Sequence, residues 1–410
     1  MNTETTHIKT ETQLIPELRF KEFDGAWQKK KFGDLSQRIG DGLHGTPKYV
    51  EESDIYFING NNLINGNVFI TDKTKKVDIN TFLKNDKKLS HKTLLISLNG
   101  TIGNIARYNN EKVMLGKSVG YFNFKTESNF YYHFLNSPKT QQFFVSELTG
   151  STIKNLSLKT LRETIIPFPS LPEQQKIASF LTAVDQKIQQ LTKKKDLLAQ
   201  YKKGVMQQLF SGKLRFKDEN GNAYPDWDEK KISKVCIRST GRSKSNEIIE
   251  TGKNIIVDMG AVSREGKLLG SKRTNCVEDY LETVDLVMAK DDIGGGQIIG
   301  KVVLIPLNGK YILGDHVYRL KVMKGDVKFL YYSINSYAVN KSFRRKANGT
   351  AQIGINNKTV DDQLIPFPCV EEQQKIASYI SSIDAKIESV HHQITQTQTF
   401  KKGLLQQLFV

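Results

Sequence analysis

The sequence predicts an α+β protein in which two pseudo-symmetric, mixed α/β domains are joined by two long antiparallel helices that form a coiled coil. Three observations support this prediction. The chain contains two copies of one large unit, each copy ends in a long stretch with helical periodicity, and the centres of the copies differ from each other. Two large copies exclude a solenoid of short repeats and indicate a pseudo-dimer within one chain.

The duplication is clearest around the long stretches. Every matched pair is displaced by the same 199 residues, as for Glu173 and Glu372. The matched segments are Ile166-Pro167-Phe168-Pro169 with Ile365-Pro366-Phe367-Pro368, residues 173–179 with 372–378, Lys202-Lys203-Gly204 with Lys401-Lys402-Gly403, and residues 207–210 with 406–409. No gap is needed, so the two stretches are expected to have the same structure.

Each long stretch carries apolar residues at alternating steps of four and three, the pattern of a coiled-coil seam. The residues expected to pair the helices are Ile177, Leu181, Val184, Ile188, Leu191 and Leu198 in the first copy, and Ile376, Ile380, Ile383, Ile387, Val390 and Ile394 in the second. Lys195, Lys202, Thr397 and Lys401 interrupt the seams, and polar seam residues can fix register at a cost in stability. The alternative is a long amphipathic helix lying on the core of its own domain; the duplication favours pairing.

These patterns give the expected domain boundaries. Residues 18–21 and 214–217 both read Leu-Arg-Phe-Lys, which extends the duplication over each whole half. We therefore expect a flexible tail at 1–14, a first domain at 15–171, a first spacer helix at 172–212, a second domain at 213–370 and a second spacer helix at 371–410.

The centres of the two domains share only scattered matches between about residues 35 and 145 and their counterparts. Apolar runs at 93–98 and 300–305, bounded by glycine and asparagine, predict strands. The segments that open at Asn129 and Val327 predict helices. A shared frame around unlike centres indicates two related tasks performed on two different targets.

Composition narrows the class of partner. The 410 residues carry a formal net charge of +17, which suits a polyanion such as nucleic acid, although a generally basic surface is the simpler alternative. No apolar run reaches the length of about 18 residues that a membrane span needs. Cys236, Cys276 and Cys369 lack metal-ligand spacing, so we expect no metal site and a cytoplasmic location.

Taken together, the paired Ile-Pro-Phe-Pro and Glu-Gln-Gln-Lys-Ile-Ala-Ser segments and the Lys-Lys-Gly…Gln-Gln-Leu-Phe ends resemble the specificity (S) subunits of Type I restriction-modification systems. The segments 41–47 and 99–103 also look like parts of the target recognition domains of that family. The resemblance implies a non-catalytic protein with two target recognition domains, which reads a bipartite, asymmetric double-stranded DNA site. It also implies two methyltransferase (modification) subunits and restriction/translocase subunits as partners, with S-adenosylmethionine, ATP and Mg bound by those partners and no cofactor in this chain.

If each domain reads one half-site, polar side chains must face base edges while lysine and arginine hold phosphates. The candidates in the first domain are His44, Thr46, Lys48, Asn99, Thr101, Ser151, Lys154 and Asn155. The candidates in the second domain are Arg242, Lys244, Arg344, Arg345, Lys346, Gln352 and Asn356. Each is individually at least as consistent with an ordinary solvated side chain, so the prediction depends on the set.

The sequence gives little support for catalysis by the chain itself. It has no Pro-Pro pair, so the Asn/Asp-Pro-Pro-aromatic signature of amino-methyltransferases is absent, and Gly116-Lys117-Ser118 lacks the earlier glycine of a phosphate-binding loop. His44 and His316 are interpreted as lone loop histidines. Two alternatives remain: a stand-alone DNA methyltransferase or nuclease-methylase with unrecognised motifs, and a coiled-coil adaptor with lectin-like or peptide-binding domains.

Overall fold

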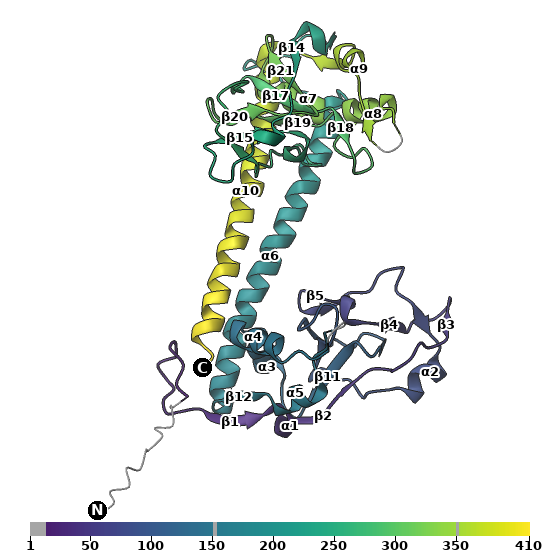
Figure 1. The fold of residues 1–410 in the computed structure, drawn as a ribbon, viewed down its shortest axis with the longest axis vertical. Coiled ribbons are helices and arrows are strands. Elements are labelled where there is room, and N and C mark those ends of the chain that lie inside the picture. Colours follow the sequence, from purple (N-terminus) through teal and green to yellow (C-terminus); the bar gives the residue numbers. More distant parts are fainter. Residues whose placement is uncertain (1–13, 151–153, 350–351) are drawn as a thin grey trace, which may run out of the picture. The chain divides into compact units, whose positions relative to one another are not determined.

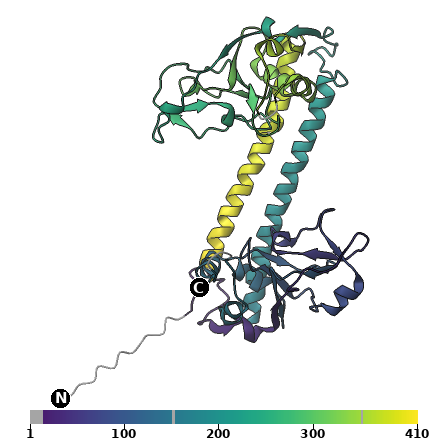
Figure 2. The same cartoon turned by 45° about the vertical axis from the view of Figure 1, so that its right-hand side comes forward.

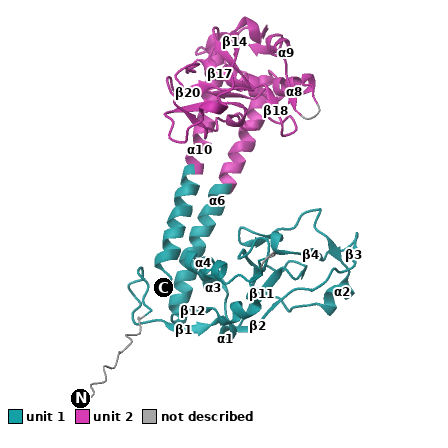
Figure 3. Cartoon of the chain, viewed as in Figure 1, with its two compact units in different colours: residues 1–192, 392–410 teal, residues 193–391 magenta. Residues whose placement is uncertain are grey.

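A computed structural model describes residues 14–150, 154–349 and 352–410. The chain forms two compact units, coloured separately in Figure 3. Unit 1 comprises residues 1–192 and 392–410, and unit 2 comprises residues 193–391. Within the described ranges, no helix is both long and apolar enough to cross a membrane.

Unit 1 is built around a four-stranded antiparallel sheet with the order β2-β11-β8-β9, and a second sheet with the order β10-β4-β7-β3 lies in the same domain (Figure 1). Its strands are β1 Gln28–Lys31, β2 Ser36–Asp41, β3 Tyr49–Val50, β4 Tyr56–Ile58, β5 Leu63–Ile64, β6 Asn67–Val68, β7 Lys76–Val77, β8 Thr93–Ser97, β9 Ile105–Arg107, β10 Val113–Leu115, β11 Val119–Phe124 and β12 Ile165–Phe168. Its short helices are α1 Phe32–Leu35, α2 Ile79–Lys84, α3 Asn129–Leu135, α4 Pro138–Ser146 and α5 Leu158–Glu163.

Unit 2 repeats this plan, with a main sheet in the order β14-β21-β17-β19 and a second sheet in the order β16-β15-β20. Its strands are β13 Asp228–Lys231, β14 Cys236–Thr240, β15 Asn254–Val257, β16 Arg273–Thr274, β17 Asp285–Ala289, β18 Asp291–Asp292, β19 Val302–Leu304, β20 Tyr311–Leu313, β21 Val317–Val322, β22 Ile353–Gly354 and β23 Leu364–Phe367. Its short helices are α7 Val327–Asn335, α8 Tyr337–Lys346 and α9 Asn357–Asp361. The strands and helices expected in the divergent centres are therefore confirmed as β8, β19, α3 and α7.

Two long helices, α6 Leu171–Phe210 and α10 Val370–Gln407, complete both units. Figures 1 and 2 show that they run side by side within each unit. In unit 1, Ile177 and Leu181 at the start of α6 share a core with Leu404 and Leu408 at the end of α10, so the helices are antiparallel. All twelve expected seam residues are buried or half-buried.

The helix ends also pack on the domain that they adjoin, so the two interpretations of the seam are both partly realised. In unit 1 the shared core extends from Leu404 and Leu408 to Trp27 and Phe130 of the domain. In unit 2, Leu209 and Ile376 lie in one core with domain residues such as Phe329. Each domain is thus anchored by the start of one long helix and the end of the other.

Two of the polar seam interruptions form corresponding ion pairs. Lys401 Nζ lies 2.5 Å from Asp185 Oδ1 in unit 1, and Lys202 Nζ lies 2.7 Å from Asp384 Oδ1 in unit 2. Because each pair joins α6 to α10 at one level, it favours a single register of the helices.

The entry to each long helix is held by a buried glutamate. Arg19 donates two hydrogen bonds of 2.8 Å to the carboxylate of Glu173, and the Trp27 indole donates a third. Arg215 and Trp227 do the same to Glu372. Beside these contacts, β1 pairs with β12 and β13 pairs with β23.

Residues 1–13 of the expected tail lie outside the described residues. Leu14, its last residue, packs against the core of unit 1 and accepts a hydrogen bond of 2.8 Å from the backbone N–H of Trp27.

Candidate nucleic-acid interface

In unit 1, several loops with polar side chains meet at one end of the main sheet. Because β2, β11 and β8 are antiparallel neighbours, the end of β2, the start of β11 and the end of β8 lie at the same end of the sheet. A hollow of about 460 Å³ opens there. It is lined by Asp41, His44, Leu98, Asn99, Lys117, Asn155, Leu156 and Leu158. The structure therefore brings together three of the predicted residues, His44, Asn99 and Asn155.

His44 is not a lone histidine, which corrects the interpretation made from the sequence. Its Nε2 lies 2.6 Å from Asp41 Oδ2, and the two residues are three apart in the sequence. That spacing was a readable signal. The exposed ring is held at the mouth of the hollow by the carboxylate at the end of β2.

Asn99 and Asn155 lie opposite each other in a short antiparallel bridge. The bridge is fixed by the neighbouring backbone hydrogen bond from Leu156 N–H to Leu98 C=O, 2.8 Å long. Thr101 is largely committed to its own loop, because its hydroxyl donates to the carbonyl of Gly60 at 3.0 Å.

The remaining unit 1 candidates differ in what the structure shows of them. Thr46, Lys48 and Lys154 are exposed, and none of them is among the described residues that line the hollow. Ser151 lies outside the described residues. Their contribution to a binding site stays a prediction.

In unit 2 the corresponding end of the main sheet is formed by the corresponding strands, but its loops carry different side chains. His316 precedes β21, and its Nδ1 lies 2.8 Å from Oδ2 of Asp291. Asp291 is the first residue of β18 and follows β17 after Lys290. Gln352 Nε2 lies 3.3 Å from the same ring nitrogen. Asp291 pairs with Gly354 as Asn99 pairs with Asn155 in unit 1, so Asp291 and Asn99 occupy corresponding positions. Among the described residues, neither His44 nor His316 is hydrogen-bonded to a serine, threonine or cysteine, so these pairs do not form a nucleophilic triad.

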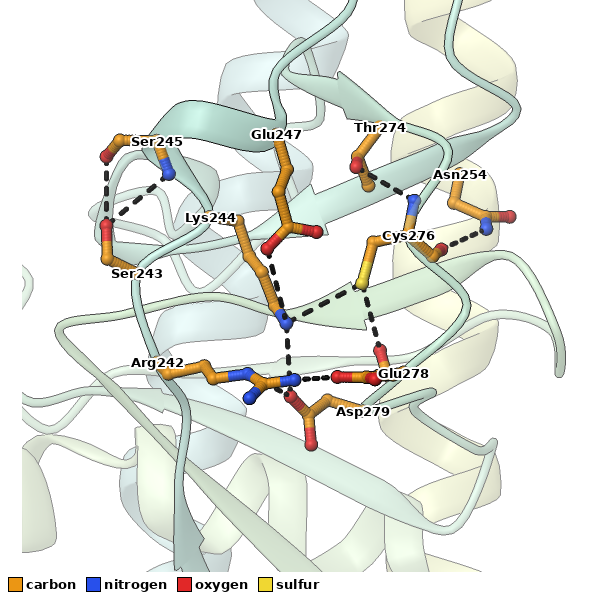
Figure 4. A network of polar contacts seen from close by, with 10 residues as sticks. All are labelled: Arg242, Ser243, Lys244, Ser245, Glu247, Asn254, Thr274, Cys276, Glu278 and Asp279. Atoms are coloured by element: carbon orange, nitrogen blue, oxygen red, sulfur yellow. Dashed lines mark hydrogen bonds and ion pairs between the residues drawn. The ribbon is translucent and has the colours of Figure 1, made fainter.

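Arg242 and Lys244 behave differently from each other (Figure 4). Arg242 is exposed and forms ion pairs with Glu278 and Asp279. Lys244 is only 2 % exposed, and its Nζ lies 3.3 Å from Asp279 Oδ2 and 3.6 Å from Cys276 Sγ. Its ammonium group is therefore enclosed by protein and is not accessible to a phosphate in this conformation.

The thiol in this network is not activated. Burial and the adjacent Glu247 raise the pKa of Cys276, outweighing the opposite influence of Lys244. A raised pKa disfavours the thiolate, which is the reactive form of cysteine. The network therefore ties the loop at 242–247 to the loop at 276–279 and has no evident chemistry of its own.

The other basic candidates of unit 2 lie on α8 and near α9. Arg344 and Arg345 are exposed in the last turn of α8, while Lys346 Nζ contacts the amide oxygen of Gln363 at 3.2 Å. Asn356 caps α9, because its Oδ1 accepts the backbone N–H of Thr359 at 2.8 Å. Asn356 thus has a structural role in addition to its predicted one.

Four residues of these two sites were not among the DNA-binding candidates predicted from the sequence: Asp41 and Lys117 in unit 1, and Asp291 and His316 in unit 2. Lys117 belongs to Gly116-Lys117-Ser118, which was considered only as the end of a phosphate-binding loop. Lys117 lies just before β11 and Asp291 lies just after β17, at the end of the main sheet where the loops meet. A correct strand order would therefore have identified them. The sequence contains no direct signal of that order.

Together the two places offer carboxylate, imidazole, amide and ammonium groups on loops at the end of a rigid sheet. Such groups match base edges and phosphates. In the described part of the chain, no cluster of three His, Cys, Asp or Glu side chains could hold a metal ion.

Comparisons with known proteins give consistent results. The family model for the Type I restriction modification DNA specificity domain matches the chain twice, at residues 25–200 and 224–398. The chain is 30% identical over 293 residues to the Type I restriction enzyme MjaVIII specificity subunit of Methanocaldococcus jannaschii, a match that spans 67% of this chain and 68% of that protein. It is 21% identical over 382 residues to the StySPI specificity subunit of Salmonella potsdam, covering 88% and 82% of the two chains.

The fold is also similar to solved structures. The S subunit of a Type I restriction-modification system from M. genitalium aligns with a TM-score of 0.60 at 16% identity, covering 96% of this chain and 99% of that chain. A chain from a study of complex assembly and conformational transition of the Type I R-M system aligns with a TM-score of 0.56 at 14% identity, covering 92% and 96%. At these identities the likeness concerns the fold.

Proposed function

This chain belongs to the Type I restriction modification DNA specificity family and is a non-catalytic DNA specificity subunit, and on that premise we propose that it reads a bipartite, asymmetric site in double-stranded DNA. One half-site is bound by each target recognition domain, at residues 15–171 and 213–370. The spacer helices at 172–212 and 371–410 hold the two domains for this purpose. The observation that carries the proposal is the family domain matched twice, with one frame and two different sets of loop residues.

The loops at the sheet ends support DNA reading in detail. His44, Asn99 and Asn155 in unit 1 and Asp291, His316 and Gln352 in unit 2 contact base edges in this proposal. Arg344 and Arg345 in unit 2, and Lys48 and Lys154 in unit 1, are exposed and hold phosphates in this proposal. The net charge of +17 supports a salt-dependent contribution from such phosphate contacts.

We further propose that two methyltransferase subunits bind the chain, one on each unit. Repeated surfaces on the long helices support two equal partners. In unit 2 the hydroxyl groups of Tyr201 and Tyr379 lie 2.7 Å apart, and the corresponding residues of unit 1 are Phe400 and Phe180. All except half-buried Tyr379 are exposed, and exposed aromatic side chains are enriched where proteins bind each other.

The remaining parts of the system follow from this assignment. Restriction/translocase subunits join the complex, S-adenosylmethionine, ATP and Mg are bound by the partner subunits, and the complex works in the cytoplasm, where its DNA lies. The basic, duplicated structure supports this more than it supports an adaptor without a nucleic-acid role.

The test is co-expression with a modification subunit of a Type I system, purification of the complex, and measurement of methyl transfer from S-adenosylmethionine to plasmid DNA. We expect co-purification, and methylation at one bipartite sequence that depends on this chain. The chain alone should transfer no methyl groups. Methyl transfer by the chain alone, or an unchanged methylation pattern when the chain is omitted, would refute the proposal.

A further inference from the structure

The loop after β17 in unit 2 is longer than its counterpart in unit 1 and carries one unusual side chain. In both units the loop closes with a glycine N–H bonded to the last residue of the strand: Gly103 to Ser97, and Gly300 to Ala289. The unit 2 loop contains the extra glycine-rich segment Gly294-Gly295-Gly296. Just before these glycines lies Ile293, whose side chain is 69% exposed.

Ile293 is held in a defined place. The carboxylate of Asp292, only 6% exposed, accepts the backbone N–H groups of Gly294 at 2.6 Å and Ile298 at 3.0 Å. One residue earlier, β18 pairs with β22 through Asp292 and Ile353. The isoleucine is therefore presented to solvent by a loop that is fixed on both sides.

The surroundings of Ile293 are polar. Because β18 and β22 are antiparallel, Ile293 and Gln352 are the next residues outward from the pair Asp292–Ile353. Gln352 contacts His316, which is paired with Asp291. Ile293 therefore adds one large exposed aliphatic side chain to three polar groups at the place that is proposed to face DNA.

We propose that Ile293 determines specificity in the second half-site by contacting the C5-methyl group of a thymine in the major groove. Among the base edges of the major groove, only thymine offers a methyl group, and aliphatic side chains read it by apolar contact. The amide of Gln352 lies beside it and suits the adjacent base edge. This inference rests on the proposed function and adds to it a base and the residue that reads it.

The experiment uses the chain in complex with its modification subunit, and duplexes that the complex selects from a random library. Each thymine of the second half-site is replaced in turn by deoxyuridine, which lacks only the methyl group. For the unaltered complex we expect one replacement to weaken binding about four-fold, the value for one buried methyl group, and the others to have little effect. The variant Ile293→Ala should bind the unmodified duplex with a comparable loss and should be insensitive to that replacement.

The matched control is Met323→Ala. Met323 is 57% exposed and follows β21 at the end opposite to His316, so its replacement should leave both the affinity and the deoxyuridine effect unchanged. A second half-site without thymine, or equal deoxyuridine sensitivity with and without Ile293, would overturn the inference. So would an equal loss of affinity for all sequences in Ile293→Ala, which would indicate an intercalating wedge. A complex that selects no sequence at all would instead refute the proposed function itself.

Discussion

Unit 1 and unit 2 can be compared position by position, because their long helices coincide at a displacement of 199 and their other shared residues follow in the same order. The buried glutamates, their arginine and tryptophan donors, and the ion pairs between the long helices are shared. The residues at the sheet ends are not. Each unit has a His–Asp pair at this end of its main sheet. Asp41 is the last residue of β2 in unit 1, whereas Asp291 lies just after β17 in unit 2. A shared frame thus carries different side chains at the sheet end of each unit.

One frame position also differs. His133 on α3 and Tyr332 on α7 correspond, and each faces an aspartate of α6 or α10. The Tyr332 hydroxyl donates to Asp384 at 2.7 Å. His133 Nε2 contacts Thr182 Oγ1 at 3.1 Å, but its Nδ1 stays 4.0 Å from Asp185 and has no hydrogen-bond partner among the described residues. The unit 1 attachment is therefore the less complete of the two.

The largest effect is expected for the Arg–Glu pairs at the start of the long helices, and it tests whether the two units depend on these shared residues equally. Arg19→Met and Arg215→Met each leave a buried glutamate, 2 % and 0 % exposed in its side chain, without its charged partner. We expect each to destabilise its own unit by about 3 kcal/mol, the lower end of the range for breaking a buried ion pair. Hydrogen exchange should show the loss in unit 1 for Arg19→Met and in unit 2 for Arg215→Met.

The matched controls are Lys31→Met and Lys231→Met, which remove exposed ion pairs at corresponding positions, with Glu163 and Asp362. These should leave hydrogen exchange unchanged. A frame variant that loosened both units equally would show that the two frames are not independent.

The next prediction tests whether each domain determines the base preference of its own half-site only. His44→Ala should weaken binding about ten-fold and relax base preference in the first half-site only, because one specific base contact contributes about 1–3 kcal/mol. His316→Ala should do the same in the second half-site. Competition binding with duplexes altered in one half-site measures both. Relaxed preference in the opposite half-site would contradict the division of labour.

The smallest effect concerns His133 and pH. Burial, followed by the charges of Arg107 and Lys401, lowers the pKa of His133 well below its usual value. Below about pH 6.5 the unfolded chain takes up a proton at this histidine while the native chain does not, so the stability of unit 1 should fall as the pH decreases. Hydrogen exchange of α3 between pH 7.5 and pH 5.5 should show this loss, and His133→Tyr, which copies unit 2, should remove it.

The control for pH is Tyr332→Phe. It removes the hydrogen bond to Asp384 in unit 2 but no group that titrates in this range, so any loss of stability should be the same at both pH values. An undiminished pH dependence in His133→Tyr would assign the effect to other groups.

The features that the sequence predicted are those encoded locally. The 4,3 spacing depends only on neighbours along one helix, so α6, α10 and the polar interruptions Lys202 and Lys401 were recognisable. The duplication added the antiparallel pairing, and short apolar runs located β8 and β19. The family resemblance came from the same segments.

The features that remained hidden depend on residues far apart in the sequence. Nothing near Arg19 indicates that it meets Glu173, and nothing near His316 indicates Asp291. Lys244 was predicted from the sequence as a DNA-binding candidate, and only the folded loop at 276–279 shows that its ammonium group is enclosed. Loop charges can be assigned to solvent, protein or DNA only when their tertiary neighbours are known.

The two units also differ in how the chain supplies them. Unit 2 is one continuous segment, residues 193–391, whereas unit 1 needs residues 392–410, whose Leu404, Leu408 and Phe409 complete its core. During synthesis on the ribosome, residues 392–410 of unit 1 follow the whole of unit 2. Unit 2 can therefore complete its core before unit 1 does. Until then the apolar face of the early domain stays uncovered, which makes it the natural target of chaperones and proteases in an unfinished chain.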